Sequence, residues 1–267
     1  MAKLLIKPSH LQGIGPKQKI SPESAGWKYV GFETYHLKKG DILKRPTGTQ
    51  EICVTLLSGH ADISSNNETW KDLGKRKSIF ERIPPFAAYL PNDDHLTITA
   101  KTDIEIALSL APGLGKHKAR LILPEHMSTE TRGEGTNTRY IHNILPETEP
   151  ADNLLVVEVY TPGGNWSSYP PHKHDSSKIP VESQLEETYY HRLNPNQGFA
   201  FQRVYTDDFD LDETMAVYDG DVVLVPKGYH PVGAPHGYDL YYLNTMAGPK
   251  RVWHFANDPK HEWMLKK

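Results

Sequence analysis

Paired cysteines, long apolar stretches and an excess of one charge are all missing from this chain of 267 residues. The single cysteine, Cys53, excludes an intramolecular disulfide, which is consistent with a reducing compartment. Residues 1–8 contain only three successive apolar side chains, too few for a signal peptide, and no stretch reaches the ~18 apolar residues of a membrane span. We therefore expect a cytoplasmic protein that has no membrane partner.

The charges are nearly balanced, with 30 lysine and arginine residues against 33 aspartate and glutamate residues. No basic stripe is present, so a nucleic-acid partner is not expected. The hydrophobic content of 37% is modest but adequate for a core, and the length suits one large or two medium domains.

Helical periodicity is also scarce, because few segments of ten or more residues repeat apolar side chains at helical spacing. Proline (21 residues) and glycine (20 residues) recur throughout and separate short runs of β-forming residues. These runs are 51–57, 83–90, 96–100, 104–110, 154–160, 199–205, 215–218, 222–225 and 240–243. Many short strands at regular spacing predict an all-β sandwich or barrel. Cys53 lies in the first of these runs, which favours a buried core thiol over a nucleophile.

The polar, glycine-rich segment 128–137 divides the chain into two halves. Each half contains an extended strand, a glycine-bounded turn, a strand that begins with glutamate and another that ends in proline, which we interpret as an internal duplication. We predict an N-terminal domain, 1–128, without a metal site and a C-terminal metal-binding domain, 129–267. The isolated histidines of the first half are expected at the surface or in turns: His36, His60 and His95.

Two histidines separated by one residue are the most informative feature of the sequence. His172 and His174 follow a pair of glycines, and side chains at positions i and i+2 of a strand point to the same face, roughly 6.5–7 Å apart. Two such imidazoles can hold one metal ion between them. With a third imidazole and a carboxylate they would suit Zn, Fe, Mn, Co or Ni, whereas three nitrogens disfavour Ca²⁺.

The remaining ligands are expected from two later segments. A strand opens with Glu186 and Glu187, whose side chains point to opposite faces, so only one of them can face the histidines. We interpret the preceding segment, 175–186, as a loop over the mouth of the site. For the last ligand His230 is preferred to His236, because His230 ends a strand run whereas His236 lies beyond another turn.

These segments resemble the two sequence motifs of the cupin superfamily. The first motif, Gly, His-x-His and a Glu that opens a strand, appears here as Gly164, His172-Lys173-His174 and Glu187. The second motif, Gly, Pro-x-Gly and His, appears as Gly220 and Pro226-Lys227-Gly228-Tyr229-His230. In the family pattern aromatic residues follow the ligand Glu closely, which favours Glu187 over Glu186.

Longer runs resemble the family of 5-deoxy-glucuronate isomerases, which act in inositol catabolism. They are Tyr169-Pro170-Pro171-His172-Lys173-His174-Asp175, Leu185-Glu186-Glu187-Thr188-Tyr189-Tyr190-His191-Arg192, Gln202-Arg203-Val204-Tyr205-Thr206-Asp207-Asp208, Val225-Pro226-Lys227-Gly228-Tyr229-His230-Pro231-Val232 and Tyr241-Tyr242-Leu243-Asn244-Thr245-Met246-Ala247-Gly248. The resemblance covers essentially the whole chain. It implies an all-β bicupin, that is, two jelly-roll barrels.

The resemblance also implies the chemistry. A divalent metal, for which zinc is expected, would be bound in the second barrel by His172, His174, Glu187 and His230. The metal would act as a Lewis acid in an aldose–ketose exchange that converts 5-deoxy-D-glucuronate, a small sugar acid, to 5-dehydro-2-deoxy-D-gluconate.

A sugar-acid substrate carries a carboxylate, for which arginine is the natural partner because its planar guanidinium can bind both oxygens. The candidates are Arg203, Arg192 and Arg139. Arg203 is preferred, because the otherwise apolar strand 199–205 gives little reason to tolerate a charge. The tyrosines that could donate to sugar hydroxyls are Tyr190, Tyr205 and Tyr229. Glu186, if it is not a ligand, is a candidate for the catalytic base.

Two other functions stay open at this stage. A cupin dioxygenase would use Fe(II) and consume O₂, and a non-catalytic sugar-binding cupin would bind its ligand without turnover. Cupins often pair through sheet edges, so a homo-oligomer is compatible with either function.

Overall fold

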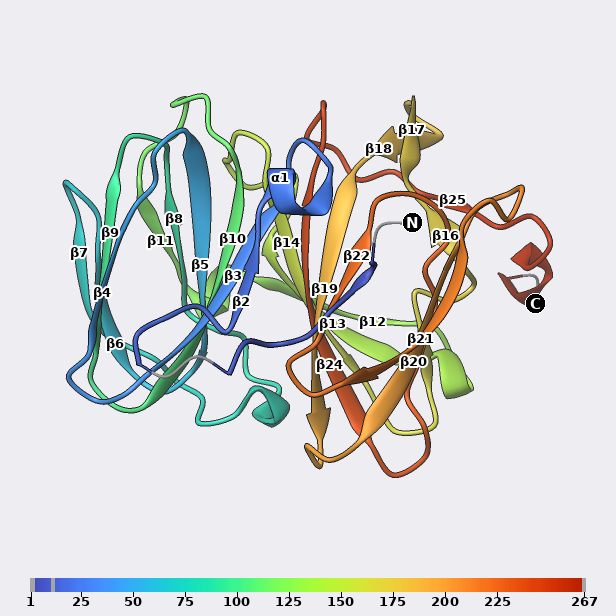
Figure 1. The fold of residues 1–267 in the computed structure, drawn as a ribbon, viewed down its shortest axis with the longest axis horizontal. Helices are drawn as coiled ribbons and strands as arrows, with labels where there is room; N and C mark the ends of the chain where they lie inside the picture. The colour runs from blue at the N-terminus through green and yellow to red at the C-terminus, as the bar shows by residue number, and fades with distance from the viewer. Residues whose placement is uncertain (1–2, 11–12, 266–267) are drawn as a thin grey trace.

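Strands dominate the computed structural model, which describes residues 3–10 and 13–265 (Figure 1). Each predicted run coincides with a strand, although only the end of 83–90 is extended, as β8 (Ala87–Leu90). The all-β prediction is confirmed. The helical segments of the described residues are short: α1 (Pro22–Ala25), η1 (Ile79–Glu81), η2 (Pro124–His126), η3 (Gly135–Asn137) and η4 (Glu262–Leu265). None of them is long and apolar enough to cross a membrane.

The first barrel, on the left of Figure 1, consists of two antiparallel sheets. One has the order β11 (Arg120–Ile122), β8, β5 (Gln50–Ser58), β10 (Ile104–Pro112), β3 (Gly31–Leu37) and β2 (Gln18–Ile20). The other has the order β4 (Ile42–Pro46), β9 (His95–Ala100), β6 (Ala61–Ser64) and β7 (Thr69–Leu73). Apolar side chains from both sheets meet in one buried cluster, which fills the interior of this barrel.

The second barrel repeats this arrangement on the right of Figure 1. Its larger sheet has the order β1 (Leu5–Ile6), β22 (Val222–Val225), β19 (Glu186–Asn194), β24 (Asp239–Ala247), β14 (Leu155–Thr161), β13 (Arg139–Leu145) and β12 (Ser128–Arg132). Its smaller sheet has the order β15 (Trp166–Ser167), β23 (Val232–Gly233), β20 (Phe199–Tyr205) and β21 (Asp212–Tyr218).

Each barrel receives one strand from the segment that precedes the other barrel. β1 comes before the first barrel but pairs with β22 of the second, and β11 comes before the second barrel but pairs with β8 of the first. β12, a strand of the second barrel, begins at Ser128, where the sequence placed the division between 1–128 and 129–267. The strands before Ser128 therefore belong to the first barrel and the strands from Ser128 onward belong to the second, except that β1 lies in the second barrel.

Strand β5 explains why continuous apolar runs form strands in this chain. Ile52 and Val54 belong to the interior cluster of the first barrel, whereas Cys53 and Leu57 belong to the cluster that spans the contact with the second barrel. Because both faces of the sheet are buried, every position favours an apolar residue. The prediction of a buried core thiol is confirmed, since Cys53 is fully buried and burial raises its pKa to about 12.

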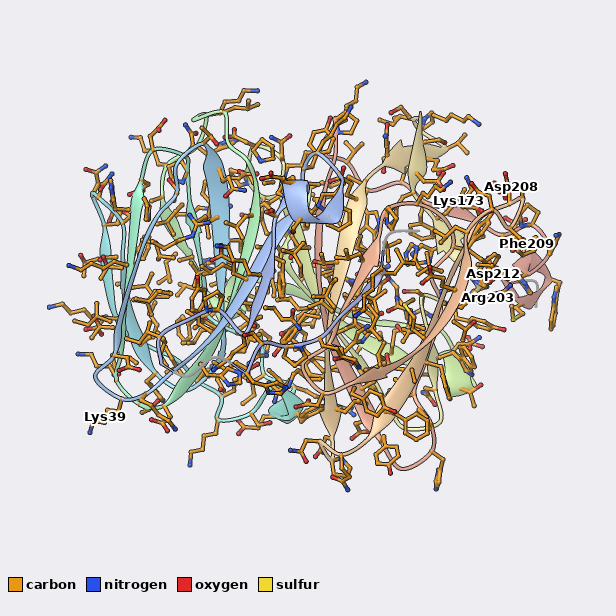
Figure 2. The ribbon with its side chains drawn as sticks, viewed as in Figure 1. Lys39, Lys173, Arg203, Asp208, Phe209 and Asp212 are labelled. Carbon is orange, nitrogen blue, oxygen red and sulfur yellow. The ribbon has the colours of Figure 1, made fainter. Side chains whose placement is uncertain are left out.

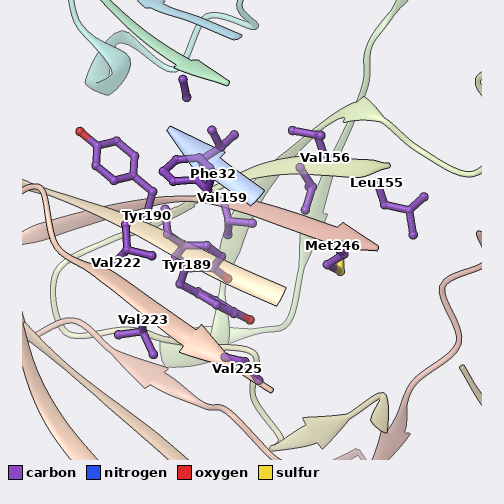
Figure 3. Close-up of a cluster of buried hydrophobic side chains, with 14 of the residues drawn as sticks. Phe32, Leu155, Val156, Val159, Tyr189, Tyr190, Val222, Val223, Val225 and Met246 are labelled. Carbon is purple, nitrogen blue, oxygen red and sulfur yellow. The ribbon is translucent and has the colours of Figure 1, made fainter. Parts of the chain in front are cut away.

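The larger sheets of the two barrels pack against each other. Phe32 of β3 and Tyr190 of β19 meet there, with ring centroids 5.6 Å apart (Figure 3). A buried ion pair crosses the same interface, because the Arg76 guanidinium donates to both carboxylate oxygens of Glu158 at 2.9 Å. Tyr241 donates a further hydrogen bond to Glu158 at 2.9 Å. An unpaired buried charge is costly, so this pair restricts how the barrels can meet.

Two glutamates at the starts of equivalent strands make matching contacts across the interface. Glu51, near the start of β5, accepts hydrogen bonds of 2.6 to 2.8 Å from the backbone N–H groups of residues 152–154. Glu186, at the start of β19, accepts hydrogen bonds of 2.7 to 3.1 Å from the backbone of residues 28–30. The halves thus repeat strand order and one pair of interface contacts, as expected of an internal duplication.

The segment before β19 forms a hairpin, so the prediction of a loop over 175–186 is wrong. β17 (Asp175–Lys178) pairs with β18 (Glu182–Gln184), and the buried Glu182 carboxylate accepts hydrogen bonds from the backbone of residues 175 and 176. This local carboxylate contact organises the turn, and residue spacing does not reveal it. The other short strands, β16 (His172–Lys173) and β25 (Ala256–Asn257), pair with each other.

Candidate metal centre

Four side chains from separate segments of the second barrel converge in its interior. His172 lies on β16, His174 follows that strand, Glu187 is the second residue of β19, and His230 follows β22. Their exposures are 9%, 2%, 2% and 0%, respectively. The structure therefore brings together the four residues that the sequence predicted as ligands, whereas the alternative His236 lies exposed in a turn.

The turn that delivers His230 depends on a glycine. Gly228 has a φ of 89°, in the left-handed region, and a side chain there would collide with the carbonyl oxygen of Tyr205. The backbones of Tyr229 and Tyr205 exchange hydrogen bonds of 2.7 and 2.9 Å, which hold the turn against β20. This anchoring keeps the His230 ring inside the barrel.

The distances suit a small metal ion. The ligand atoms of the three imidazoles lie within 4.8 Å of one another. Glu187 Oε2 lies 3.0 Å from Nε2 of His174 and 3.3 Å from Nε2 of His230. Three nitrogens and one carboxylate oxygen match the ligand types of zinc and of other divalent transition metals.

Hydrogen bonds behind two of the rings decide which nitrogen faces the centre. Nδ1 of His230 lies 2.9 Å from the carbonyl oxygen of Gly228, and Nδ1 of His174 lies 3.2 Å from that of Leu185. Only a protonated nitrogen donates to a carbonyl, so Nε2 of each neutral ring directs a lone pair toward Glu187. Two facing acceptors repel each other unless a proton or a cation lies between them. Nε2 of His230 has no hydrogen-bond partner among the described residues, which fits a metal ligand.

Burial sets the charge state of these histidines. It lowers the pKa of His172 well below its usual value and lowers the pKa of His230 to about 4. Burial has the same tendency at His174, but the hydrogen bond and the charge of Glu187 outweigh it and raise the pKa of this residue. His172 and His230 are therefore neutral near pH 7, and a metal would displace any proton between His174 and Glu187.

Glu186 does not face this centre, which corrects its prediction as a catalytic base. Since it is adjacent to Glu187 on β19, its side chain points to the opposite face of the sheet. Both of its carboxylate oxygens accept backbone hydrogen bonds from the first barrel. Its partners lie 156 to 158 residues earlier in the chain, so the sequence could not show them.

Tyr190 and Arg192 lie on the same interface face of β19. Tyr190 donates a hydrogen bond of 2.6 Å to Glu105 of the first barrel. Arg192 forms ion pairs with Glu105 and with Asp219, the second at 2.7 Å. These positions remove both residues from a substrate site beside the histidines, which corrects the prediction made from sequence.

Arg203 lies on the outer face of β20 next to Asp212 (Figure 2). Its guanidinium donates to both carboxylate oxygens of Asp212, at 2.7 and 2.8 Å, and its side chain is 40% exposed. The strand tolerates this charge because its side chains alternate, with Gln202 and Val204 buried on the inner side. The preference for Arg203 as the substrate arginine is therefore not supported by its position.

The hydroxyl groups of Tyr205 and Tyr229 are engaged by carboxylates of the protein. Tyr205 donates to Asp258 and Tyr229 donates to Asp207, both at 2.8 Å. These contacts fasten surface segments to the barrel. The structure thus assigns both tyrosines, which the sequence suggested as sugar-binding residues, to contacts with protein carboxylates.

A cavity of about 760 Å³ opens beside His172, and a chamber of about 30 Å³ extends from there to Glu187. Arg139 lines both spaces. Its Nη1 donates to the carbonyl oxygens of residues 137 and 169, at 3.1 and 3.2 Å, and it forms no ion pair within the described part of the chain. Burial lowers its pKa. Arg139 is therefore the predicted arginine that the structure places beside the histidines.

Sequence reasoning missed several residues of this cavity. Arg132 lines both spaces, and Tyr189 and Tyr242 line the inner chamber. Tyr189 lies two residues after Glu187 on β19, so strand alternation could have placed it on the same face. Tyr242 lies on β24, whose pairing with β19 is a matter of tertiary structure.

Comparison with known proteins is in keeping with this geometry. The sequence profile of the KduI/IolB family matches residues 4–264. The chain belongs to the KduI/IolB family. This confirms the resemblance that the sequence motifs carried.

Relatives of this KduI/IolB chain match it over nearly their full length. It is 57% identical over 265 residues to a protein of Geobacillus thermodenitrificans (strain NG80-2), with 99% of this chain and 97% of the relative covered. It is 48% identical over 271 residues to a protein of Bacillus subtilis (strain 168), with 100% of both covered. Both relatives bear the name 5-deoxy-glucuronate isomerase.

Solved structures identify the fold of this family member. An IolB-like protein from Salmonella typhimurium LT2 has a TM-score of 0.96 and 50% identity, covering 99% of this chain and 100% of that one. An oxalate decarboxylase from Lactobacillus farciminis has a TM-score of 0.71 and 11% identity, covering 100% and 91%. The second likeness concerns the fold alone. The prediction of a bicupin is confirmed.

Proposed function

We propose that this protein is an isomerase that converts 5-deoxy-D-glucuronate to 5-dehydro-2-deoxy-D-gluconate in inositol catabolism. The observation that carries the proposal is the convergence of three imidazoles and one carboxylate on a cavity that also contains a guanidinium without an ion pair in the described residues. The names of relatives 46–57% identical to this chain support the same reaction.

His172, His174, Glu187 and His230 would hold a divalent metal, and we propose zinc because the reaction needs no change of oxidation state. When bound, such an ion supplies Lewis-acid polarisation of the sugar's carbonyl and hydroxyl oxygens. Nδ1–H groups of His174 and His230 donate to backbone carbonyl oxygens, which positions these two ligands.

Arg139 would bind the substrate carboxylate. Its hydrogen bonds in the structure come from one nitrogen, Nη1, which leaves donors on the other side of the guanidinium for a carboxylate. A half-buried guanidinium that forms no ion pair with the described residues is electrostatically suited to an anionic ligand. The outer cavity of about 760 Å³ is large enough for a six-carbon sugar acid.

The decisive experiment measures metal content and sugar conversion on the same preparations. We expect one divalent ion per chain, and we expect His172→Ala and His174→Ala to lose both the ion and the activity while the fold is retained. His95→Ala, an exposed histidine of the first barrel, is the matched control and should keep both. Full turnover in either ligand variant would end the assignment. Consumption of O₂ would favour a dioxygenase, and binding without turnover would favour a sugar-binding protein.

A second comparison tests the carboxylate site. Arg139→Ala is expected to raise KM about 100-fold, the size of a lost charge-assisted contact, with metal content unchanged. Arg203→Ala, which removes an exposed ion pair, is expected to leave KM unchanged. The reverse pattern would return the carboxylate site to Arg203.

Three further expectations belong to this proposal. We propose that the chain divides functionally into 1–128 and 129–267, that it acts in the cytoplasm, and that it forms a homo-oligomer. Fractionation and light scattering of the native protein would test the last two.

A further inference from the structure

Two tyrosine–serine pairs meet at the inner chamber. The hydroxyl of Tyr242 forms a short hydrogen bond with fully buried Ser167, and the hydroxyl of Tyr189 lies 2.8 Å from that of Ser168. The two tyrosine rings pack together with centroids 4.8 Å apart. Among the described residues, no carboxylate other than Glu187 lines this chamber. Hydroxyl groups are therefore the natural proton carriers there.

The proposed reaction contains one proton transfer that does not depend on its route. An aldose becomes a ketose when one hydrogen moves from C2 to C1 and one proton moves from the oxygen on C2 to the oxygen on C1. An enediol route moves the carbon-bound hydrogen as a proton, and a hydride shift moves it with its electron pair. In both routes, a group near the two oxygens can serve as acid toward one and base toward the other.

We propose that Tyr242 is this group, an inference that rests on the function proposed above. Its O–H bond breaks as the proton passes to the oxygen on C1, which becomes a hydroxyl group. The O–H bond on C2 breaks as its proton passes to the phenol oxygen, and C2 becomes the carbonyl carbon. The phenol is restored, and neither an oxidant nor a reductant is consumed.

The surroundings favour Tyr242 over Tyr189. Tyr189 lies two residues from Glu187 on the same face of β19, and its ring packs against the ring of His230 with centroids 5.6 Å apart, which makes it a support for the candidate ligands. Burial raises the pKa of Tyr242, while the Ser167 hydrogen bond and the Arg139 charge oppose this rise. The Ser167 hydrogen bond and the nearby Arg139 charge therefore distinguish Tyr242 as the proton carrier.

Ser167 is a positioning residue for this phenol. It lies on β15, and the next residue, Ser168, has a φ of 49°, a left-handed conformation that serine rarely adopts. This backbone directs two successive serine hydroxyls to two different tyrosines.

In the first barrel, strand register places Ile106 at the position of Tyr242, and this side chain has no proton to exchange.

The test compares Tyr242→Phe with Tyr241→Phe, which removes the neighbouring phenol from the opposite face of the same strand. In the metal-loaded protein, Tyr242→Phe is expected to lower kcat about 10²–10⁴-fold and to change KM by less than about threefold. Metal content should equal that of the unsubstituted protein, and Tyr241→Phe should keep its kcat. Ser167→Ala should lower kcat about tenfold with KM retained, because the phenol loses its orienting partner.

Each contrary outcome has a distinct meaning. Unchanged kcat in Tyr242→Phe, an increase in KM alone, or loss of metal from this variant would each overturn the proton relay and leave the isomerase function standing. If the unsubstituted, metal-loaded protein fails to convert the sugar, the proposed function is wrong and the relay falls with it.

Discussion

The two barrels of this chain share strand order and pairing register, yet their interiors differ at a few positions. In strand register, Ile52 of β5 occupies the position between β8 and β10 that Glu187 of β19 occupies between β22 and β24. By the same register Leu56 corresponds to His191. The first interior is formed mainly by an apolar cluster, beside which the buried Glu33 accepts hydrogen bonds from Tyr35 and Arg45, whereas the second contains the candidate metal ligands.

This difference shows that the fold and the chemistry place separate demands on the same strands. The alternation of side chains and the apolar contact between the larger sheets build both barrels, and neither depends on what lies at the innermost positions of the second. A few inward-facing positions can therefore exchange aliphatic for polar side chains. The polar interior is retained because its groups have partners, such as Gln202 at 2.8 Å from Nε2 of His191.

The largest effect is expected when a first-barrel residue is placed in the second barrel. Glu187→Ile should abolish metal binding and lower turnover by about 10³-fold or more, because the ligand carboxylate is lost. Elemental analysis and a turnover assay measure both. The reference variant is Ile52→Val, which should keep metal and activity and cost about 0.5–1.5 kcal/mol of unfolding free energy. A metal-loaded, active Glu187→Ile protein would contradict the assignment of Glu187 as a metal ligand.

The next largest effect concerns the contact between the barrels. Arg76→Met leaves the buried carboxylate of Glu158 without its ion pair and should lower the free energy of unfolding by about 3–5 kcal/mol. Urea denaturation measures the loss. The double variant Arg76→Met, Glu158→Leu should recover part of it, because no buried charge is then left alone. A double variant less stable than the single one would contradict this account.

The matching glutamates should show smaller effects, the larger of them at Glu51, which is fully buried and also accepts a hydrogen bond from Tyr89. Glu51→Gln and Glu186→Gln each weaken three hydrogen bonds to backbone N–H groups and should each cost about 1–3 kcal/mol in urea denaturation. Metal content and kcat of Glu186→Gln should stay unchanged, in contrast to changes at Glu187. A stable Glu186→Gln protein without turnover would instead return Glu186 to the active site.

The smallest effect concerns acid stability of the metal-free protein. Burial lowers the pKa of His191 to about 4, so between about pH 6.5 and 4 the unfolded chain binds a proton there that the folded chain does not. Stability is therefore lost as the pH falls through this range. His191→Leu should reduce the loss between pH 6.5 and 5 by about 1–2 kcal/mol, measured by urea denaturation at each pH. The exposed control His95→Ala should show the same loss as the unsubstituted protein.

Strand content and the histidine pair could be predicted because both depend on local periodicity. Runs such as 222–225 are apolar and bounded by turn residues, and His172 and His174 share a face by simple alternation. The substrate residues could not be predicted in this way. Arg203 belongs to a strand with apolar neighbours, but the alternation places it in solvent beside Asp212.

The amino-acid order by itself determined the strands, the duplication and three histidines able to bind a metal, because each follows from spacing along one or two segments, whereas the choice of Glu187 over Glu186 came from the resemblance to the cupin motif. Only the tertiary structure decided that Glu186 and Arg192 hold the barrels together, while Arg139 and Tyr242 lie beside the histidines. The reason is that a strand's alternation says which residues share a face, but what covers that face depends on segments distant in the sequence, 87 residues away for Arg192 and Glu105 and 158 for Glu186 and Lys28.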